Sequence, residues 1–369
     1  IRDSMYTVSY NGNGATSGSA PASATVASGG SHTVASNPFS KTGSVFTGWN
    51  TAANGSGTAY AAGATISNIT SNITLYAQWA ANPAISFNAN TPAGAVTTVT
   101  GLPSNTTVTY NTSYTLPSTT PSVMGYTFAG WKISNTGTTY NAGGTTGNIT
   151  TATTFYAQWT ERTGFSAVFY DQASGATDGT AYNTQGSLKW TANVTLPAAP
   201  TKLGYTFGGW FFQKDSNGSG TGTQMTSAMT FNNLWNAAKG AGQANESTTT
   251  IKLYAKWTEK DRVTFTLDPN GGSYGSAGTG VTTTANIPNG GSYTIPNVTN
   301  PTRVGYNFLG WTETKNSTTA TKYQAGATFN DLTTSRTLYA LWQAAQVTFT
   351  FQPGATDATA LKTPNPYTM

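Results

Sequence analysis

A short aromatic phrase returns along this chain and constrains its fold more than any other feature. Its copies read Gly43-Ser-Val-Phe-Thr-Gly-Trp49, Gly125-Tyr-Thr-Phe-Ala-Gly-Trp131, Gly204-Tyr-Thr-Phe-Gly-Gly-Trp210 and Gly305-Tyr-Asn-Phe-Leu-Gly-Trp311. A second phrase follows each copy: Leu75-Tyr-Ala-Gln-Trp79, Phe155-Tyr-Ala-Gln-Trp159, Leu253-Tyr-Ala-Lys-Trp257 and Leu338-Tyr-Ala-Leu-Trp342. Recurrence of this kind predicts tandem copies of one structural unit.

The spacing of the second phrase sets the size of the unit at roughly 80 residues. We predict four modules, residues 1–81, 82–161, 162–260 and 261–345, and an incomplete fifth, 346–369. Because the fifth stops before either phrase, we expect a longer array. The third module carries about 17 extra residues between Trp210 and Trp257. There the apolar positions 225, 229, 234, 235 and 238 recur near the helical period, which predicts a short helix.

Outside that insertion the pattern is that of β-structure. Each module opens with an alternating strand, such as Tyr6-Thr-Val-Ser-Tyr10 or Val263-Thr-Phe-Thr-Leu267, followed by turn residues such as Asn270-Gly271. A second strand, a proline-marked crossing and the two aromatic strands come next. The sequence therefore predicts a mainly β protein made of small tandem modules.

The aromatic phrases are interpreted as the structural core motif of each module. Phe128 and Trp131 can enter the same core only if the strand is bulged at Gly130, and Gly125 fits a turn that needs positive φ. Burial of such large side chains stabilises a small module by about 1.5–3 kcal/mol each. The motif comprises Phe46, Trp49, Tyr76, Trp79, Tyr126, Phe128, Trp131, Tyr156, Trp159, Tyr205, Phe207, Trp210, Tyr254, Trp257, Tyr306, Phe308, Trp311, Tyr339 and Trp342.

A second interpretation gives some aromatic residues a binding role. Rings that stay in water next to polar neighbours can stack on sugars. Trp190, Tyr60, Tyr140 and Tyr323 are the candidates for glycan contact, because they fall in predicted loops or polar strands.

Composition narrows the class of protein. Only 8% of the residues are charged, cysteine is absent, and the formal charge of +5 is spread thinly without a basic stripe. A nucleic-acid partner is therefore not expected. No run approaches the ~20 apolar residues of a membrane span. A cysteine-free chain rich in Gly, Ser, Thr and Asn fits an extracellular protein of a bacterial or archaeal cell surface.

The sequence offers few residues in patterns that suggest catalysis. The string Gly271-Gly-Ser-Tyr-Gly275 lies in a predicted hairpin turn rather than a strand-to-helix turn, and the single histidine, His32, belongs to another module. One histidine and no cysteine exclude a zinc site built from those ligands. We expect no catalytic residues, no cofactor and no metal, although calcium at Asp268 and Asn270 stays open as an alternative.

Both phrases and their spacing resemble the Listeria–Bacteroides repeat, also called the internalin B-repeat type. Thr201-Lys-Leu-Gly-Tyr205 and Thr302-Arg-Val-Gly-Tyr306 match its pattern best, and the resemblance covers four modules and the start of a fifth. Module 1 departs with Ser44-Val45, and module 2 lacks the usual basic residue before Gly125. The resemblance implies a compact β-grasp-like module on bacterial surface proteins, used as a spacer, adhesive or ligand-binding repeat.

These observations lead to one functional hypothesis and one alternative. We expect a structural rod, filament or sheath whose chief partners are copies of itself, joined through strand edges that carry few charges. The alternative is an adhesin stalk or glycan-binding array that contacts surface glycans or ligands on a host or neighbouring cell. An enzymatic role would require a domain outside these residues.

Overall fold

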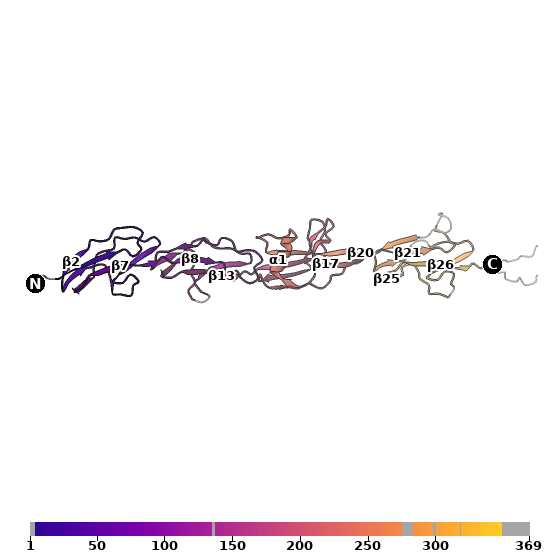
Figure 1. The fold of residues 1–369 in the computed structure, drawn as a ribbon. Helices are drawn as coiled ribbons and strands as arrows, with labels where there is room; N and C mark the ends of the chain where they lie inside the picture. The colour runs from indigo at the N-terminus through magenta and orange to yellow at the C-terminus, as the bar shows by residue number, and fades with distance from the viewer. Residues whose placement is uncertain (1–3, 135–136, 275–282, 298–299, 318, 349–369) are drawn as a thin grey trace, which may run out of the picture.

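The computed structural model describes residues 4–134, 137–274, 283–297, 300–317 and 319–348. The predicted fold class is confirmed, since strands make up 48% of the structure and helix 3%. The sheets follow one another in a row from the N-terminus to the C-terminus (Figure 1). Most of the predicted fifth module lies outside the described residues.

Module 1 shows the basic topology. Its strands are β1 (Met5–Asn11), β2 (Ala24–Ala27), β3 (Gly30–Thr33), β4 (Ser44–Asn50), β5 (Ala59–Tyr60), β6 (Thr65–Ile69) and β7 (Ile73–Ala81). The main sheet has the order β2-β1-β7-β4-β5, and β3 pairs with β6 in a second small sheet. The first and last strands run parallel, with Val8 opposite Ile73, so the ends of the module are paired side by side.

Modules 2 and 4 repeat this arrangement. Module 2 contains β8 (Ala84–Asn88), β9 (Thr106–Thr107), β10 (Thr112–Thr115), β11 (Tyr126–Lys132), β12 (Thr145–Ile149) and β13 (Thr153–Glu161). Module 4 contains β21 (Val263–Asp268), β22 (Thr283–Ile287), β23 (Gly291–Thr294), β24 (Tyr306–Thr312), β25 (Thr328–Leu332) and β26 (Arg336–Ala344). The main sheets are ordered β11-β13-β8-β9 and β22-β21-β26-β24.

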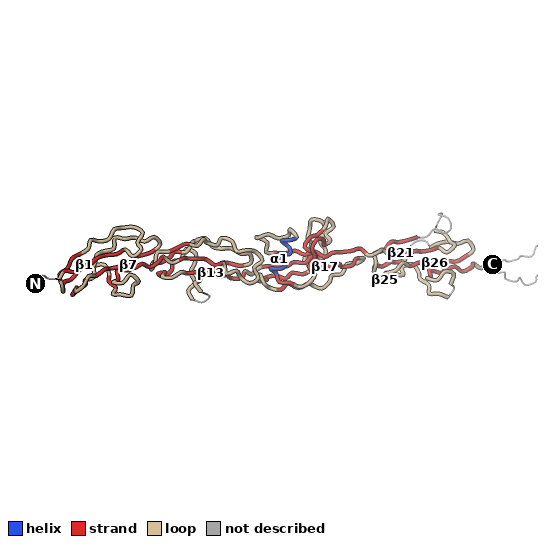
Figure 2. Tube along the Cα trace, in the orientation of Figure 1, coloured by secondary structure: helices blue, strands red, loops and turns tan. Residues whose placement is uncertain are grey.

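Module 3 keeps the sheet and adds the helix. Its elements are β14 (Phe165–Tyr170), β15 (Asn183–Leu188), β16 (Asn193–Val194), β17 (Tyr205–Lys214), β18 (Gly220–Met225), β19 (Met229–Thr230), α1 (Phe231–Gly240) and β20 (Thr250–Glu259). Figure 2 shows α1 in blue among the strands. The predicted helix is confirmed, and it buries Leu234, Trp235 and Ala238. Met225 and Met229, which shared its apolar period, lie instead in β18 and β19.

The first aromatic phrase forms a bulged strand in all four modules. The register shifts after Phe46, Phe128, Phe207 and Phe308. In module 2 the bulge falls at Gly130, whose φ is 119°, and the turn before the strand places Gly125 at φ 85°. Both predictions for these glycines are confirmed. The extra residue turns the tryptophan inward, so that Trp49, Trp131, Trp210 and Trp311 are all buried.

The second phrase closes the module over the turn after the first strand. In module 2 the indole Nε1 of Trp159 donates a hydrogen bond to the carbonyl of Ala89 at 3.0 Å. Asn90, at φ 40°, donates from its side chain to the carbonyl of Ala157 at 2.8 Å. The same pair of bonds recurs with Trp79 and Asn13 in module 1, and with Trp342 and Asn270 in module 4. In these three modules the Asn of the turn thus clamps the closing strand. In module 3 the Trp257 indole donates to the carbonyl of Asp171 at 2.7 Å.

Short connections join the modules. Closing and opening strands are separated by residues 82–83, 162–164 and 260–262 only. Just after each closing strand, a backbone N–H donates to the carbonyl of the phrase glycine, from Asn82 to Gly43, Arg162 to Gly125 and Lys260 to Gly204. Each joint therefore continues the hydrogen-bond ladder between the two aromatic strands of the preceding module.

Candidate functional site

Residues considered for catalysis or metal binding have structural partners. The His32 Nε2 atom lies 2.8 Å from the Tyr10 hydroxyl, which accepts a hydrogen bond from the Ala35 N–H. The Asp268 carboxylate accepts the backbone N–H of Asn270 at 2.7 Å. Ser273 bridges to Thr302 through backbone hydrogen bonds, and Gly275 lies outside the described residues. Within the described ranges, His, Asp and Glu form no cluster that could hold a metal ion.

Three of the candidates for glycan contact occupy equivalent positions in their modules. Tyr60, Tyr140 and Tyr323 each lie opposite the tryptophan of the first phrase, in a paired strand or bridge. All three are half-buried and pack against the core of their module. Tyr60 borders a recess of 250 Å³, and Tyr323 borders one of 180 Å³. These rings are therefore only partly accessible to a ligand.

The prediction of an exposed ring at Trp190 is wrong. Trp190 is 0% exposed and lies in a core cluster that crosses from module 3 into module 2. Its ring packs on Gly125, where a Cβ would stand 2.2 Å from the indole. A flat platform for stacking on a sugar is therefore absent at this residue. The position looked polar because the contacts of the ring, with Phe165, Phe231 and Trp235 of module 3 and with Gly125 of module 2, are all distant in sequence.

Several tyrosines assigned to the structural core motif lie elsewhere. Tyr76, Tyr156 and Tyr339 point to the sheet face opposite to that of Leu75, Phe155 and Leu338, as strand alternation requires. Tyr254, by contrast, is buried at 7% exposed. Tyr306 is 39% exposed. Tyr205 is half-buried and has the Lys202 ammonium 4.3 Å from its ring centroid. Tyr126 packs against the core of module 3.

The remaining motif residues form one aromatic unit per module. Phe46, Phe128, Phe207 and Phe308 are half-buried, and each lies edge-on to both tryptophans of its module, with ring centroids 5.1–5.9 Å apart. Trp79, Trp159, Trp257 and Trp342 are half-buried beneath the turn they bond. The phenylalanine and the two tryptophans of each module therefore pack against each other.

The joint between modules 2 and 3 is the most elaborate contact between modules. The carbonyl of Gly94 accepts hydrogen bonds from Trp190 Nε1 at 3.1 Å and from the Asn232 side chain at 2.7 Å. The Glu161 carboxylate accepts both the N–H and the hydroxyl of Thr191. These bonds hold the pKa of Glu161 below its usual range. Met124 of module 2 is buried in the same core.

The other joints bring smaller surfaces together. At Gly43, the phrase glycine of module 1, an added Cβ would meet nothing within 4 Å. At Gly204 it would approach Pro288 of module 4 at 3.2 Å. Leu203 of module 3 is 62% exposed at that joint, whereas Met124 is 6% exposed at the preceding one. The joints therefore differ in how firmly they fix neighbouring modules.

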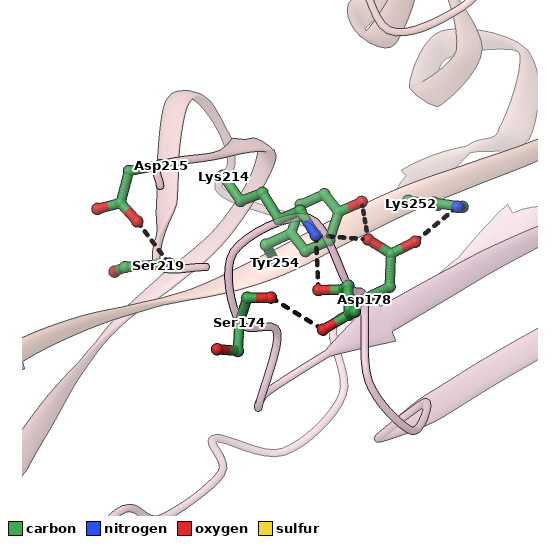
Figure 3. Close-up of polar contacts among 8 residues, drawn as sticks. Ser174, Asp178, Lys214, Asp215, Ser219, Lys252 and Tyr254 are labelled. Carbon is green, nitrogen blue, oxygen red and sulfur yellow. Dashed lines mark hydrogen bonds and ion pairs between the residues drawn. The ribbon is translucent and has the colours of Figure 1, made fainter. Parts of the chain in front are cut away.

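Sequence reasoning missed a charged cluster around Asp178 (Figure 3). Its carboxylate pairs with the Lys214 ammonium at 2.8 Å and the Lys252 ammonium at 2.6 Å, and accepts the Tyr254 hydroxyl at 2.8 Å. These hydrogen bonds outweigh desolvation, the largest opposing effect, and hold the pKa of Asp178 well below its usual range. The pKa of Tyr254 is raised by burial and by the bond to Asp178. A carboxylate so strongly held in its ionised form anchors the loop before β15 to the sheet.

A series of uncharged edge strands lies along the array. Next to the opening strand of each module is an outer strand: β2 (ATVA), β9 (TT), β15 (NTQGSL) and β22 (TTANI). Each ends its sheet, so one side of its backbone pairs with no described strand. None carries a charged residue or a proline, the features that usually prevent sheets from pairing edge to edge.

Comparisons with known proteins agree with the repeat structure. The family model described as the Listeria-Bacteroides repeat domain matches residues 6–78, 84–158, 167–234 and 262–341. A "Putative Gly-rich membrane protein" of Evansella cellulosilytica is 28% identical over 313 residues, which are 83% of this chain and 31% of the relative. A "Putative membrane protein" of the same organism is 26% identical over 199 residues, 54% of this chain and 24% of the relative. The chain spans less than a third of either relative. In the part that the structure describes, no helix is long and apolar enough to cross a bilayer.

Proposed function

Because this chain belongs to the Listeria-Bacteroides repeat family, we propose that it is a non-catalytic, extracellular structural array on a prokaryotic cell surface. Its copies associate through the exposed edges of their sheets into a filament or sheath. The membrane-protein names of the relatives support a surface location. The uncharged edge strands are the single observation that carries the assembly proposal.

Edge association follows from backbone chemistry. An outer strand presents unpaired N–H and C=O groups, and a second strand laid beside it satisfies them. Since the four outer strands are built mainly from Thr, Ala, Asn and similar uncharged residues, their own side chains bring no charge into an edge contact. The one charged group bonded to such a strand among the described residues is Arg262, which donates to the carbonyl of Asn286 in β22. Several weak contacts along two aligned arrays add up, because the second module binds at the high effective concentration that the first creates.

The test is to charge the edges. Thr25, Thr184 and Thr284 are exposed residues of β2, β15 and β22, and replacing all three with lysine adds three positive charges where two edges would meet. In sedimentation velocity at rising concentration, we expect the unmodified chain to associate and the edge variant to stay monomeric. The proposal fails if the two chains sediment alike.

A matched variant controls for the added charge. Thr7 and Thr264 are exposed residues of β1 and β21, and each of these strands has a neighbour on both sides. Lysines at these two positions, compared with lysines at Thr25 and Thr284 alone, change the net charge equally without charging an edge. We expect this control to associate like the unmodified chain. Loss of association in the control would mean that net charge, rather than edge pairing, governs assembly.

The alternative of an adhesin stalk predicts separate rods at every concentration. Glycan binding by Trp190 can no longer support it, because that ring is buried.

A further inference from the structure

The joint between modules 2 and 3 forms one side of a recess. Its volume is 620 Å³, within the range of roughly 300–1,000 Å³ typical of small-molecule sites. Module 2 contributes residues 96–98, 100, 122–124 and 126, and the other side is formed by Arg162, Lys239 and Glu246. The recess therefore exists only while the two modules keep their relative position.

The floor of the recess is apolar, and packing holds its side chains in place. Val123 and Met124 are 5% and 6% exposed, and Tyr126 packs against the core of module 3. The Tyr126 hydroxyl donates to the carbonyl of Ala93, which fixes the ring. An apolar floor beside an aromatic ring suits the C–H face of a sugar.

The rim supplies hydroxyl groups. Thr97, Thr98, Thr100 and Ser122 line the recess, and Thr97 Oγ1 already accepts the Met124 N–H at 3.3 Å. Thr98 and Ser122 are exposed. Hydroxyls both donate and accept hydrogen bonds, as the hydroxyls of a saccharide do.

The side chains that line the recess carry more positive than negative charge. Lys239 and Glu246 form an ion pair at 2.6 Å. Arg162 stands over the Phe165 ring at 5.5 Å, and among the described residues its guanidinium has no acidic partner. The lining thus carries two basic groups against one acid. Because a guanidinium binds carboxylate and phosphate through paired hydrogen bonds, Arg162 is suited to an acidic ligand.

We propose that this recess binds a saccharide unit that carries an acidic group, either a carboxylate or a phosphate. The sugar ring lies on Val123, Met124 and Tyr126, its hydroxyls face the rim, and its acidic group bonds Arg162. A ligand held between both modules would also stiffen their joint, since binding favours the arrangement that forms the site.

The test is a titration of the full chain, isotopically labelled, followed by amide chemical shifts in NMR. Methyl β-D-glucuronide and glucose 6-phosphate represent the two acidic groups, with methyl β-D-glucoside as the neutral sugar and inorganic phosphate as the bare anion. We expect both acidic sugars to shift the amides of Thr97, Thr98 and Val123. The neutral sugar and the bare anion should each bind about tenfold more weakly, since each lacks one half of the interaction.

Two variants locate the acidic contact. Arg162 is exposed, so Arg162→Gln removes the charge without disturbing the core, and it should weaken both acidic sugars about tenfold. Arg262→Gln is the control at the next joint, where Arg262 pairs with Glu259, and it should leave binding unchanged. The proposal is overturned if the shifts map elsewhere, if the neutral sugar or bare phosphate binds as tightly, or if Arg162→Gln binds like the unmodified chain. None of these outcomes depends on whether the chain assembles.

Discussion

At the scale of single residues, the repeated side chains fill the core of each module and hydrogen-bond its closing strand to the turn after the first strand. The inward tryptophan fills the core, the closing tryptophan donates to the turn, and the asparagine in that turn donates back to the closing strand. Asn tolerates the left-handed region better than other residues with a Cβ, so it can occupy the turn and still bond the strand. The small modules are therefore held by specific hydrogen bonds as well as by burial.

The clamp at Asn90 gives a prediction for module 2. Asn90→Ala removes the hydrogen bond to Ala157 and places Ala at φ 40°, so we expect it to destabilise the module by about 2 kcal/mol. Asn90→Gly keeps the backbone conformation accessible and should cost about 1 kcal/mol. Hydrogen exchange of the β13 amides measures both, with β26 of module 4 as an internal reference. Equal effects of the two variants would show that the left-handed backbone does not matter here.

The Asp178 cluster gives a prediction about pH. The pKa of this carboxyl is lowered in the folded state, so its contribution to stability is present above the unfolded pKa of about 3.9 and is lost as pH falls below it. Asp178→Asn should therefore reduce the loss of module 3 stability between about pH 4 and pH 2. It should also destabilise the module at neutral pH, because Lys214 and Lys252 lose their shared partner.

A nearby carboxylate is the control for this pH effect. Asp215 lies in the turn after β17 and accepts backbone N–H groups of Asn217 and Ser219 (Figure 3). Asp215→Asn should retain the acid-induced loss that arises from Asp178. The measurement is the urea midpoint of module 3, read from its own amides, at several pH values. If the urea midpoint of Asp178→Asn fell at acid pH as steeply as that of the unmodified chain, the role assigned to Asp178 would be contradicted.

At the scale of elements, strands and helix followed from periodicity and turn residues, whereas contacts between distant elements did not. The bulge at Gly130 and the turn at Gly125 could be predicted, because Phe128 and Trp131 cannot otherwise share a core. The helix was predicted from its apolar period. Its period extended falsely to Met225 and Met229 because apolar strand residues happened to match it.

The candidate sites were harder to predict, for a physical reason. Trp190 packs on Phe165, Phe231 and Trp235 of its own module and on Gly125 of the preceding one. All of these are distant in sequence, so the polar residues next to Trp190 in the chain suggest a ring in water. Asp178 is 36 residues from Lys214 and 74 from Lys252, so no local spacing in the sequence indicates that cluster. The repeat frame places Trp190 where the other modules hold Ser28, Tyr110 and Asn289, and a tryptophan at that turn was the available signal.

The joint between modules 2 and 3 gives a prediction at this scale. Gly125→Ala strains a residue at φ 85° and drives a Cβ to within 2.2 Å of the Trp190 ring. Gly43→Ala is the matched control, since its φ is 68° but its Cβ would meet nothing within 4 Å. Both should lose about 1–2 kcal/mol locally from backbone strain. Only Gly125→Ala should add about 1–3 kcal/mol from overpacking at the joint.

Exchange of the Trp190 indole N–H reads this joint directly, because that group bonds the carbonyl of Gly94 across the interface. Exchange should speed up in Gly125→Ala and stay unchanged in Gly43→Ala. Equal exchange in the two variants would mean that the packing of Trp190 on Gly125 does not hold the modules together.

At the scale of the whole molecule, the described modules form an extended row with its ends far apart (Figure 1). Connections of two or three residues, each bonded to the preceding phrase glycine, limit bending between modules. An array of this kind exposes its outer strands repeatedly along its length. Function, in this account, belongs to the array rather than to any single module.

The most direct test is negative-stain electron microscopy of the protein from its native surface, beside residues 1–369 made recombinantly and the lysine variant of the outer strands. The account predicts regular filaments or sheets in the native and recombinant samples, with a repeat that matches the modules. It also predicts single rods for the edge variant. Dispersed single rods in all three samples would contradict assembly through strand edges and favour a stalk.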